Sequence, residues 1–258
     1  MQKIKNICQL IILSTLMIAT GCKKEKEPYA RIQLYLKDSP ADFDSLLIRI
    51  FSIELISDSS RYSEKITVKQ AKPINILQYT NEKDTLLGEF FFNAPSLERI
   101  TITFGSSHTL YRKNKSIAIN LKDSIYTLLL NKAIVLKNAE LNKLYLDFDC
   151  YFSLQKRKDT WELNPVVKLR TADSTGSVRG KVKTLGKMPF VWLISTSDTL
   201  STLPQKDGFF HILYVRPGKY SLWLLISEDE EDATPTKIIE EIQVEPSKVT
   251  GVGTLLIN

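Results

Sequence analysis

The sequence predicts an all-β protein, and three of its features lead to this prediction. Short apolar stretches with period-two alternation recur along the chain, as in strands that bury one face of a sheet. Polar turn residues separate these stretches. Apolar residues at helical spacing are scarce. We therefore expect two β-sandwich domains that follow a cleaved signal peptide.

The N-terminus has the three parts of a bacterial secretion signal, which we expect at residues 1–21. Two lysines precede an apolar run from Ile7 to Ala19, and Thr20-Gly21 places small residues before Cys22. The run is shorter than the roughly 20 residues of a transmembrane helix. The pattern resembles the lipobox of bacterial lipoproteins, although Ala19 stands where leucine or valine is commoner. The resemblance implies a lipid on Cys22, followed by a polar tether at residues 22–29. An ordinary cleaved signal with a chance cysteine is the alternative.

Charge and cysteine content exclude two kinds of protein. The formal net charge is +6, but basic and acidic residues are interspersed. Nucleic-acid binding needs a concentrated basic face, so we expect no nucleic-acid partner. Cys8 lies in the signal and Cys22 would be acylated, which leaves Cys150 alone in the mature chain and permits no intramolecular disulfide.

The first domain is expected at residues 30–172. Its opening strand alternates Ile32, Leu34 and Leu36 with polar residues. At residues 46–56 the alternation changes phase, which predicts one strand with a β-bulge, with a helix as the alternative. Short helical turns are expected at residues 74–79 and 96–99. Further strands are expected at residues 66–68, 90–92, 100–104, 117–119, 126–130, 144–152 and 166–169.

A second domain is expected at residues 177–258, after a small, polar linker that ends near Gly176. Asp207-Gly208 predicts a hairpin turn, because glycine adopts positive φ at low cost. Pro217-Gly218 predicts a type II turn. Strands are expected at residues 178–182, 191–194, 209–215, 220–226, 238–244 and 252–257.

The second domain resembles the carboxypeptidase regulatory-like, or prealbumin-like, β-sandwich module. The matching residues are Gly180-Lys181-Val182, Asp207-Gly208-Phe209-Phe210 and Pro217-Gly218-Lys219-Tyr220. Met188-Pro189-Phe190 departs from the pattern, where such modules usually carry a small residue, and this puts the edge packing of the second strand in question. The resemblance implies a rigid spacer or interaction module and not a catalyst.

The first domain resembles a family of unknown function, number forty-three eighty-two, that is common in secreted bacterial lipoproteins. The likeness is carried by residues 37–42, 73–77, 146–149 and 163–169, with Ser39 where the family usually has alanine. The resemblance implies a fold and a location outside the cytoplasm, and it implies no reaction.

Two carboxylates are the candidate ligand-binding residues of the first domain. Asp147 and Asp149 project from the same face of a predicted strand. With Asp38 or Asp42 they could hold Ca²⁺, or they could form an acid/base pair. The alternative is a structural role, in which they pair with lysine or arginine or accept hydrogen bonds from backbone. We assign no catalytic residue, no metal ligand and no cofactor.

The histidines and tryptophans are expected to be ordinary structural residues. His108 and His211 are the only histidines, too few for a zinc site without further ligands. Trp161, Trp192 and Trp223 are expected to pack in the cores, and a platform for sugars or proteins is the alternative.

These features predict a lipoprotein held by Cys22 on a membrane of the cell envelope, most simply the outer membrane, at its periplasmic or surface face. We expect a non-catalytic binding or structural component with a protein or glycan partner. The alternatives are a carboxylate-dependent hydrolase that uses Asp147 and Asp149, and a calcium-stabilised adhesin. The sequence does not specify an oligomeric state.

Overall fold

The computed structural model describes residues 29–39, 41, 43–68, 72–158, 160–173, 175–226 and 235–257. Within these ranges nearly all regular structure is β-strand, which confirms the predicted all-β class. The predicted signal peptide and Cys22 lie outside the described residues. No helix in the described part is long and apolar enough to cross a bilayer.

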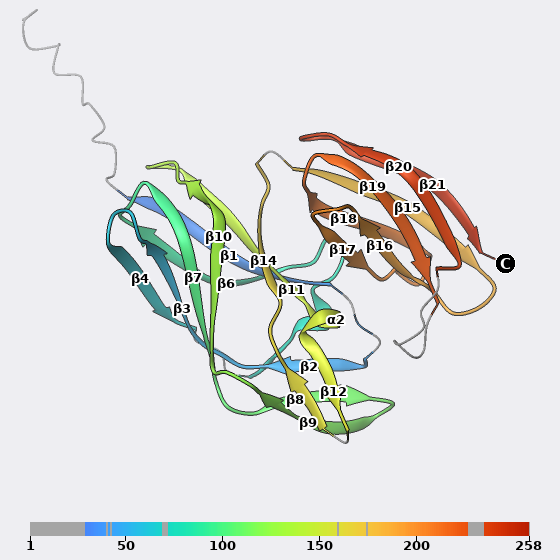
Figure 1. The fold of residues 1–258 in the computed structure, drawn as a ribbon, viewed down its shortest axis with the longest axis horizontal. Helices are drawn as coiled ribbons and strands as arrows, with labels where there is room; N and C mark the ends of the chain where they lie inside the picture. The colour runs from blue at the N-terminus through green and yellow to red at the C-terminus, as the bar shows by residue number, and fades with distance from the viewer. Residues whose placement is uncertain are drawn as a thin grey trace, which may run out of the picture.

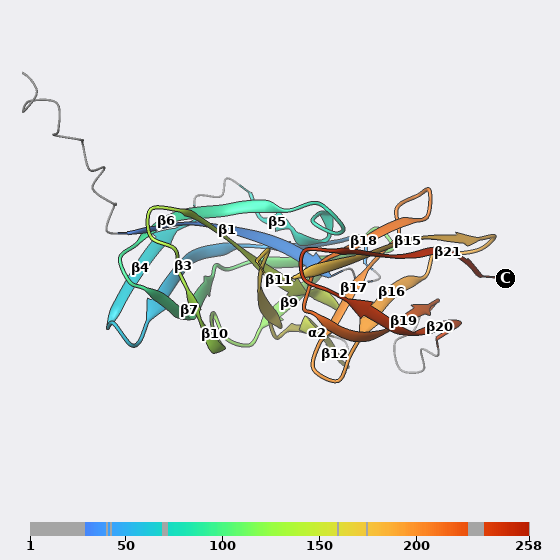
Figure 2. The ribbon, with the colours of Figure 1, turned by 90° about the horizontal axis from the view of Figure 1, so that it is seen from above.

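Two modules follow one another along the long axis of the molecule (Figure 1). The first module starts with β1 (Ala30–Ser39) at one end, and the second finishes with β21 (Val249–Ile257) at the other. The view from above keeps the same order (Figure 2). The described chain therefore enters and leaves the fold at opposite ends.

Three sheets make up the described part of the first module. The first has the order β14 (Val167–Thr171), β11 (Leu141–Asp149), β1, β6 (Thr85–Phe92), and the second has the order β10 (Ile125–Val135), β7 (Ser96–Phe104), β3 (Ile50–Ser57), β4 (Tyr62–Thr67). The third has the order β12 (Leu154–Arg157), β13 (Thr160–Leu163), β9 (Lys115–Leu121), β8 (His108–Arg112), β2 (Ser45–Ile48), β5 (Ile74–Asn75). Two short helices, η1 (Ile76–Gln78) and α2 (Cys150–Ser153), join strands.

The first module encloses a core of apolar side chains. Ile32, Leu34 and Leu36 of β1 are buried, as their alternation predicts. β1 pairs in parallel with β11 and antiparallel with β6, so it is the centre of its sheet. Each large apolar side chain that is fully buried stabilises the fold by roughly 1.5–3 kcal/mol.

The second module has two sheets and a separate core. The sheets have the orders β18 (Phe209–Val215), β15 (Gly176–Thr184), β21 and β17 (Thr199–Thr202), β16 (Phe190–Ile194), β19 (Gly218–Leu225), β20 (Lys237–Val244). Val178, Phe210 and Leu222 are among the fully buried residues of this core. The first core includes residues up to Val167, so the two cores divide between Val167 and Val178.

The phase change at residues 46–56 coincides with a β-bulge, as predicted, but the segment is not one strand. The segment forms two strands, β2 and β3, which lie in different sheets with Arg49 between them. A register shift against β7 follows at residues 50–52, and Phe51 there is exposed. Leu46, Ile48 and Ile50 keep one alternation across the change of sheet, and the phase changes only at the bulge near the start of β3.

The helical turn predicted at residues 74–79 is confirmed in part, since η1 spans Ile76–Gln78. The one predicted at residues 96–99 is wrong. Residues 96–99 belong to β7, which pairs with a strand on each side, and this pairing outweighs the weak helical signal. The strand predicted at residues 144–152 ends at Asp149, where α2 begins. Gly208 has the predicted positive φ of 86°, but the strands before and after it, β17 and β18, lie in different sheets and form no hairpin.

Candidate functional site

The structure describes the side chains of two of the four predicted ligand-binding residues. Asp147 and Asp149 lie near the end of β11. Asp38 lies in β1, where it is the register partner of Phe148, but its side chain is not described. Asp42 lies outside the described residues. No group of three or more His, Cys, Asp or Glu side chains suited to a metal ion occurs in the described part of the chain.

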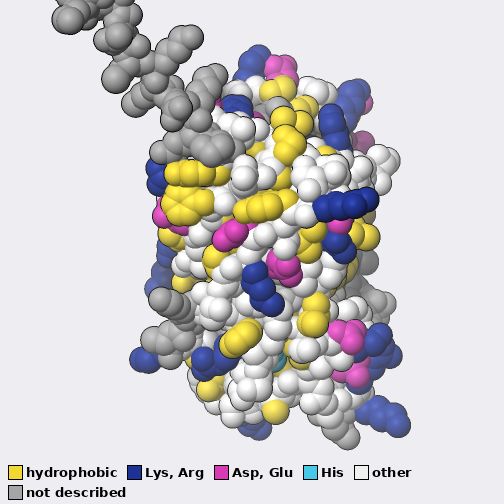
Figure 3. Space-filling view, turned by 90° about the vertical axis from the view of Figure 1, so that its left-hand side faces the viewer, with side chains coloured by type: hydrophobic (Ala, Val, Ile, Leu, Met, Phe, Trp, Pro, Cys, Tyr) yellow, Lys and Arg dark blue, Asp and Glu magenta, His cyan; other side chains and the backbone are white. Residues whose placement is uncertain are grey.

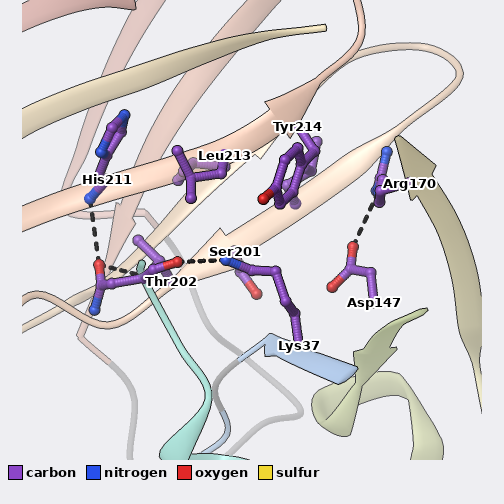
Figure 4. A pocket seen from close by; sticks show the side chains of 11 residues that line it. Lys37, Asp147, Arg170, Ser201, Thr202, His211, Leu213 and Tyr214 are labelled. Atoms are coloured by element: carbon purple, nitrogen blue, oxygen red, sulfur yellow. Dashed lines mark hydrogen bonds and ion pairs between the residues drawn. The ribbon is translucent and has the colours of Figure 1, made fainter. Parts of the chain in front are cut away.

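Asp147 belongs to an ion cluster between the two modules. Its Oδ2 atom accepts a hydrogen bond from Nε of Arg170 on the neighbouring strand β14, at 3.1 Å. Side chains alternate along β11, so Asp147 and Tyr145 project from the same face, toward the second module. Figure 4 shows Asp147 pointing toward Arg170. Asp147 therefore contributes its carboxylate to an ion pair with a guanidinium that is itself buried.

Arg170 connects the modules through Asp198, which precedes β17. Its guanidinium forms two hydrogen bonds with the Asp198 carboxylate, one of them from Nη2 to Oδ1 at 3.1 Å. Lys168 Nζ reaches the same carboxylate at 3.2 Å. The side chains of Arg170 and Asp198 are each only 3% exposed. We call Asp147, Lys168, Arg170 and Asp198 the ion cluster.

The charges of the ion cluster affect one another strongly because the cluster is buried. Burial opposes the charged form of Arg170, but Asp147 and Asp198 more than offset this effect, and the pKa of Arg170 is raised. Burial likewise opposes the charged form of Asp198, yet Arg170 and Lys168 hold its pKa below the ordinary value. Both groups therefore stay charged, and each depends on its partner.

Asp149 has a different environment, although it lies only two residues from Asp147. Its side chain caps α2, where Oδ1 accepts a hydrogen bond from the backbone N–H of Phe152 at 3.2 Å. Burial raises the pKa of Asp149 to about 6, and the charge of Asp147 adds to the shift. Such a group can take up a proton near neutral pH, but its side chain is almost fully buried and has a local structural role.

A column of tyrosines and one lysine lies beside the ion cluster. Tyr145 of the first module stacks on Tyr35 and on Tyr214 of the second module, with ring centroids 5.3 and 4.1 Å apart. Lys37 Nζ lies 5.4 Å from the centre of the Tyr214 ring, an attractive cation–π contact. Burial lowers the pKa of Lys37, with Asp147 opposing the shift. Burial also raises the pKa of Tyr214.

The backbone of β18 explains how Tyr214 reaches the first module. Its pairing with β15 shifts register between Val178 and Gly176, which leaves Leu213 and Tyr214 in a bulge. Tyr214 has a φ of 57°, in the left-handed region that bulky residues rarely adopt. A bulge bends a strand and redirects a side chain. Here it places the Tyr214 ring against Tyr145.

Asn81 makes a third connection between the modules. Its side-chain amide donates to the carbonyl of Leu203 at 3.0 Å. Its Oδ1 accepts from the Thr202 hydroxyl at 3.0 Å and from the His211 N–H at 3.2 Å. Next to it, Glu82 and His211 Nδ1 lie 2.7 Å apart. The Asn81 side chain thus forms hydrogen bonds with backbone groups of the second module, as a neighbouring strand would.

These groups surround a small cavity between the modules (Figure 4). The cavity has a volume of about 30 Å³. This is room for roughly one or two water molecules and not for a sugar or a peptide. Of the two predicted carboxylates, Asp147 therefore lies at a buried contact between the modules, beside a cavity of this size.

The remaining predicted site residues lie in separate places. Trp161 is buried in the first core against Phe43. Trp192 packs on Tyr151 and Phe152 of the α2 segment, with ring centroids 4.9 and 5.7 Å away. Trp223 is the cross-strand partner of Trp192. Trp192 and Trp223 thus lie side by side, apart from Trp161. Neither belongs to the core of the second module, so the predicted core packing is confirmed for Trp161 alone. Trp192 adds an aromatic contact between the modules.

Several residues of this interface had no signal in the sequence analysis. Asp198, Arg170 and Asn81 lie on separate elements and meet only in space. The bulge at Tyr214 is visible only in the structure, where Phe210, Ile212 and Val215 are buried at spacings of two and then three, because Leu213 and Tyr214 are apolar too and hide this change in the sequence. That change of spacing in a strand indicates a bulge.

Comparison with known proteins identifies the first module. The family described as "Domain of unknown function (DUF4382)" matches residues 29–165. No curated protein matches the chain. At the fold level the chain is similar to the Bacillus anthracis TIE protein, with 10% identity, a TM-score of 0.25, and coverage of 100% of this chain and 45% of that one. The chain thus spans about half the length of that protein.

Two pilins are similar at the same level. The shaft pilin SpaA of Lactobacillus rhamnosus GG, as its E269A mutant, has 9% identity and a TM-score of 0.25, with coverage of 89% of this chain and 96% of the pilin. The minor pilin of Streptococcus agalactiae has 11% identity and a TM-score of 0.24, with coverage of 88% and 96%. These likenesses are confined to β-rich architecture. The family match spans more than half of the sequence, and the chain belongs to the DUF4382 family.

Proposed function

We propose that this protein is a lipid-anchored, non-catalytic binding or structural component of the bacterial cell envelope. The anchor is Cys22, which follows an apolar run and small residues typical of a lipoprotein signal. Six residues separate Cys22 from Tyr29, the first described residue. An extended segment of that length spans at most about 25 Å, so the start of β1 would stay close to the bilayer.

The surface around the start of β1 suits a position near a membrane. Phe91 and Leu141 are exposed and are the register partners of Arg31 on the two sides of β1. Tyr29 packs on Phe91 with ring centroids 5.2 Å apart. Figure 3 shows hydrophobic side chains gathered beside the point at which the grey chain meets the fold. Aromatic and basic side chains together favour the headgroup region of a bilayer.

The observation that carries the non-catalytic assignment is the use of the two candidate carboxylates. Asp147 is bound to Arg170, and Asp149 caps α2. The cavity beside Asp147 is too small for a substrate. With those contacts Asp147 supports the arrangement of the modules and Asp149 supports α2. The outer surfaces remain available for a partner.

The anchor is tested by mass spectrometry and membrane fractionation of the full chain expressed in a lipoprotein-processing bacterium. The wild type should lose residues 1–21, carry acyl chains on Cys22 and sediment with membranes. Cys22→Ser should lose the acyl mass and leave the membrane fraction once the cells are washed with salt. Cys8→Ser is the matched control and should behave as the wild type, because residue 8 lies within the signal. An unacylated wild-type Cys22 would refute the anchor.

A further inference from the structure

A groove between two sheet edges is a feature of the described surface that the proposed function leaves unexplained. It has a volume of about 560 Å³ and lies where β10 and β14 approach each other next to the second module. β10 and β14 are each the edge strand of their sheet (Figure 1). We call it the strand-edge groove.

The edge of β14 faces this groove, and at Leu169 no other strand of the described part pairs with its backbone. Asp149 N–H donates to Val166 O, and residues of an antiparallel strand alternate between bonding toward the partner and pointing away from it. Positions 167, 169 and 171 therefore point away from β11. The Tyr126 hydroxyl meets Val167 at 3.3 Å, in agreement with this direction.

β10 presents a similar edge from the opposite side. Phe104 N–H donates to Ser124 O, and the same alternation turns the backbone of residues 125, 127 and 129 away from β7. The register with β7 then breaks between Leu129 and Ile134. Residues 130–133 consequently have no partner in β7, and three of them line the groove: Leu130, Asn131 and Lys132.

The side chains of the groove favour an occupant with negative charge. Lys132 of β10 and Arg216 of the second module line it, together with Lys168 and Arg170. Asp198 is the one carboxylate among the lining residues, and it is already bound by Lys168 and Arg170. Neither Lys132 nor Arg216 has a side-chain partner in the described part of the chain. The apolar side chains of Leu128, Leu130 and Leu169 lie between the edges.

We propose that an extended, acidic segment of a partner protein binds the strand-edge groove by adding a strand to β14. This inference rests on the proposed binding function and assigns its partner to the class of peptides. Backbone groups of the segment would pair with the N–H and C=O of Leu169 and with the N–H of Thr171. The carbonyl of Thr171 already accepts a hydrogen bond from the Thr175 hydroxyl at 3.0 Å. Alternate side chains would face the leucines and the cations, because side chains of a strand point to opposite faces. An edge that bonds backbone selects a peptide over a glycan.

The test measures fluorescence anisotropy of labelled octapeptides with the full chain in detergent micelles. The first probe alternates valine and glutamate, and the second alternates valine and lysine. The acidic peptide should bind about tenfold more tightly than the basic one, since only its charges complement Lys132 and Arg216. Equal affinity, or binding of neither peptide, would overturn the proposal.

A second pair of probes tests the backbone hydrogen bonds. N-methylation of alternate residues of the acidic peptide removes every N–H on one edge and leaves the other edge intact. Strand addition predicts that one of the two methylated registers loses about tenfold or more in affinity while the other retains it. Equal losses in both registers would mean that charge alone drives binding, which would overturn strand addition.

Charge reversal locates the site on the protein. The double variant Lys132→Glu and Arg216→Glu should prefer the basic peptide over the acidic one. The matched control, Lys65→Glu and Lys219→Glu, has the same change in net charge at exposed positions away from the groove and should keep the wild-type preference. Unchanged preference in the groove variant would overturn the assignment. Both variants should show the circular dichroism of the wild type.

Two further results would identify a different occupant of the strand-edge groove. Self-association of the full chain that the acidic peptide inhibits would make the occupant a second copy, and binding of a glycan panel instead of peptides would make it a sugar. Either result overturns the peptide assignment. The acylation test of Cys22 is independent of all peptide results, so failure of the groove and failure of the anchored-component proposal can be told apart.

Discussion

In the cores of the two modules almost every buried side chain is apolar, whereas several buried side chains between the modules carry charge. Phe90 and Phe92 belong to the first core and Phe210 to the second. Lys37, Arg170 and Asp198 are comparably buried, but they meet where the modules touch. Apolar contacts are non-directional and adapt to small shifts. Buried ion pairs stabilise only in good geometry, so they restrict the relative orientation of the modules far more strongly.

This difference suggests a division of roles. The apolar cores stabilise each sandwich, and the ion cluster with Asn81 holds the two sandwiches in one arrangement. The strand-edge groove depends on that arrangement, because Arg216 and Tyr214 come from the second module and β10 from the first. The first prediction therefore concerns Arg170, the centre of the ion cluster.

Arg170→Met should have the largest effect. The substitution leaves the carboxylates of Asp147 and Asp198 without their guanidinium in a site where both are buried or nearly so. We expect a loss of about 3–5 kcal/mol in the free energy of unfolding, measured by urea denaturation at pH 7.

The double variant Arg170→Met with Asp198→Leu is the control for this effect. It removes the buried charge together with its partner and should recover a large part of the lost stability. A loss below about 1 kcal/mol in the single variant would show that the ion cluster contributes no more than an exposed pair.

The second prediction compares the two neighbouring carboxylates by pH. The folded-state pKa of Asp149 is raised to about 6 from 3.8, so the folded protein binds this proton more tightly than the unfolded chain does. Its contribution therefore becomes more favourable as the pH falls from about 7 to about 4, by up to about 3 kcal/mol, and is constant below that window.

Asp198 acts in the opposite direction. Its lowered pKa gives stability that is present above the ordinary carboxyl pKa and is lost as the pH falls further. The measurement is urea denaturation of the wild type and of Asp149→Asn between pH 4 and 7. The variant should lack the gain in stability on acidification, and the exposed control Asp173→Asn should retain it. Parallel pH profiles for the wild type and Asp149→Asn would contradict the assignment.

The sequence was sufficient for the fold class and for much of the strand pattern, because alternation and burial are local. Ile32, Leu34 and Leu36 show this directly, since their spacing alone predicts the buried face that β1 has. The division at Arg49 was not predictable in this way. The alternation of Leu46, Ile48 and Ile50 continues across the change of sheet, so this break leaves no signal in the sequence, whereas the bulge in β3 does.

The candidate site was predicted only in part, for a related reason. The spacing of Asp147 and Asp149 gives their common face, but their different roles depend on residues far away in the sequence. Arg170 and Asp198 pair across the two modules, and no local pattern indicates which carboxylate a given arginine will meet. Asp149 caps a helix of four residues, which is too short to leave a periodic signal.

The smallest effect is expected for an exposed ion pair of similar length. Lys181 Nζ lies 3.3 Å from the Asp207 carboxylate, close to the 3.2 Å between Lys168 and Asp198. Asp207 is 62% exposed and Asp198 only 3%, so water already solvates one pair and not the other. Lys168→Ala should lower the free energy of unfolding by about 1 kcal/mol, since Asp198 keeps Arg170. Lys181→Ala should leave the urea midpoint unchanged within error. If the two variants lose equal stability, burial does not distinguish the interface from the surface, and the comparison between cores and interface fails.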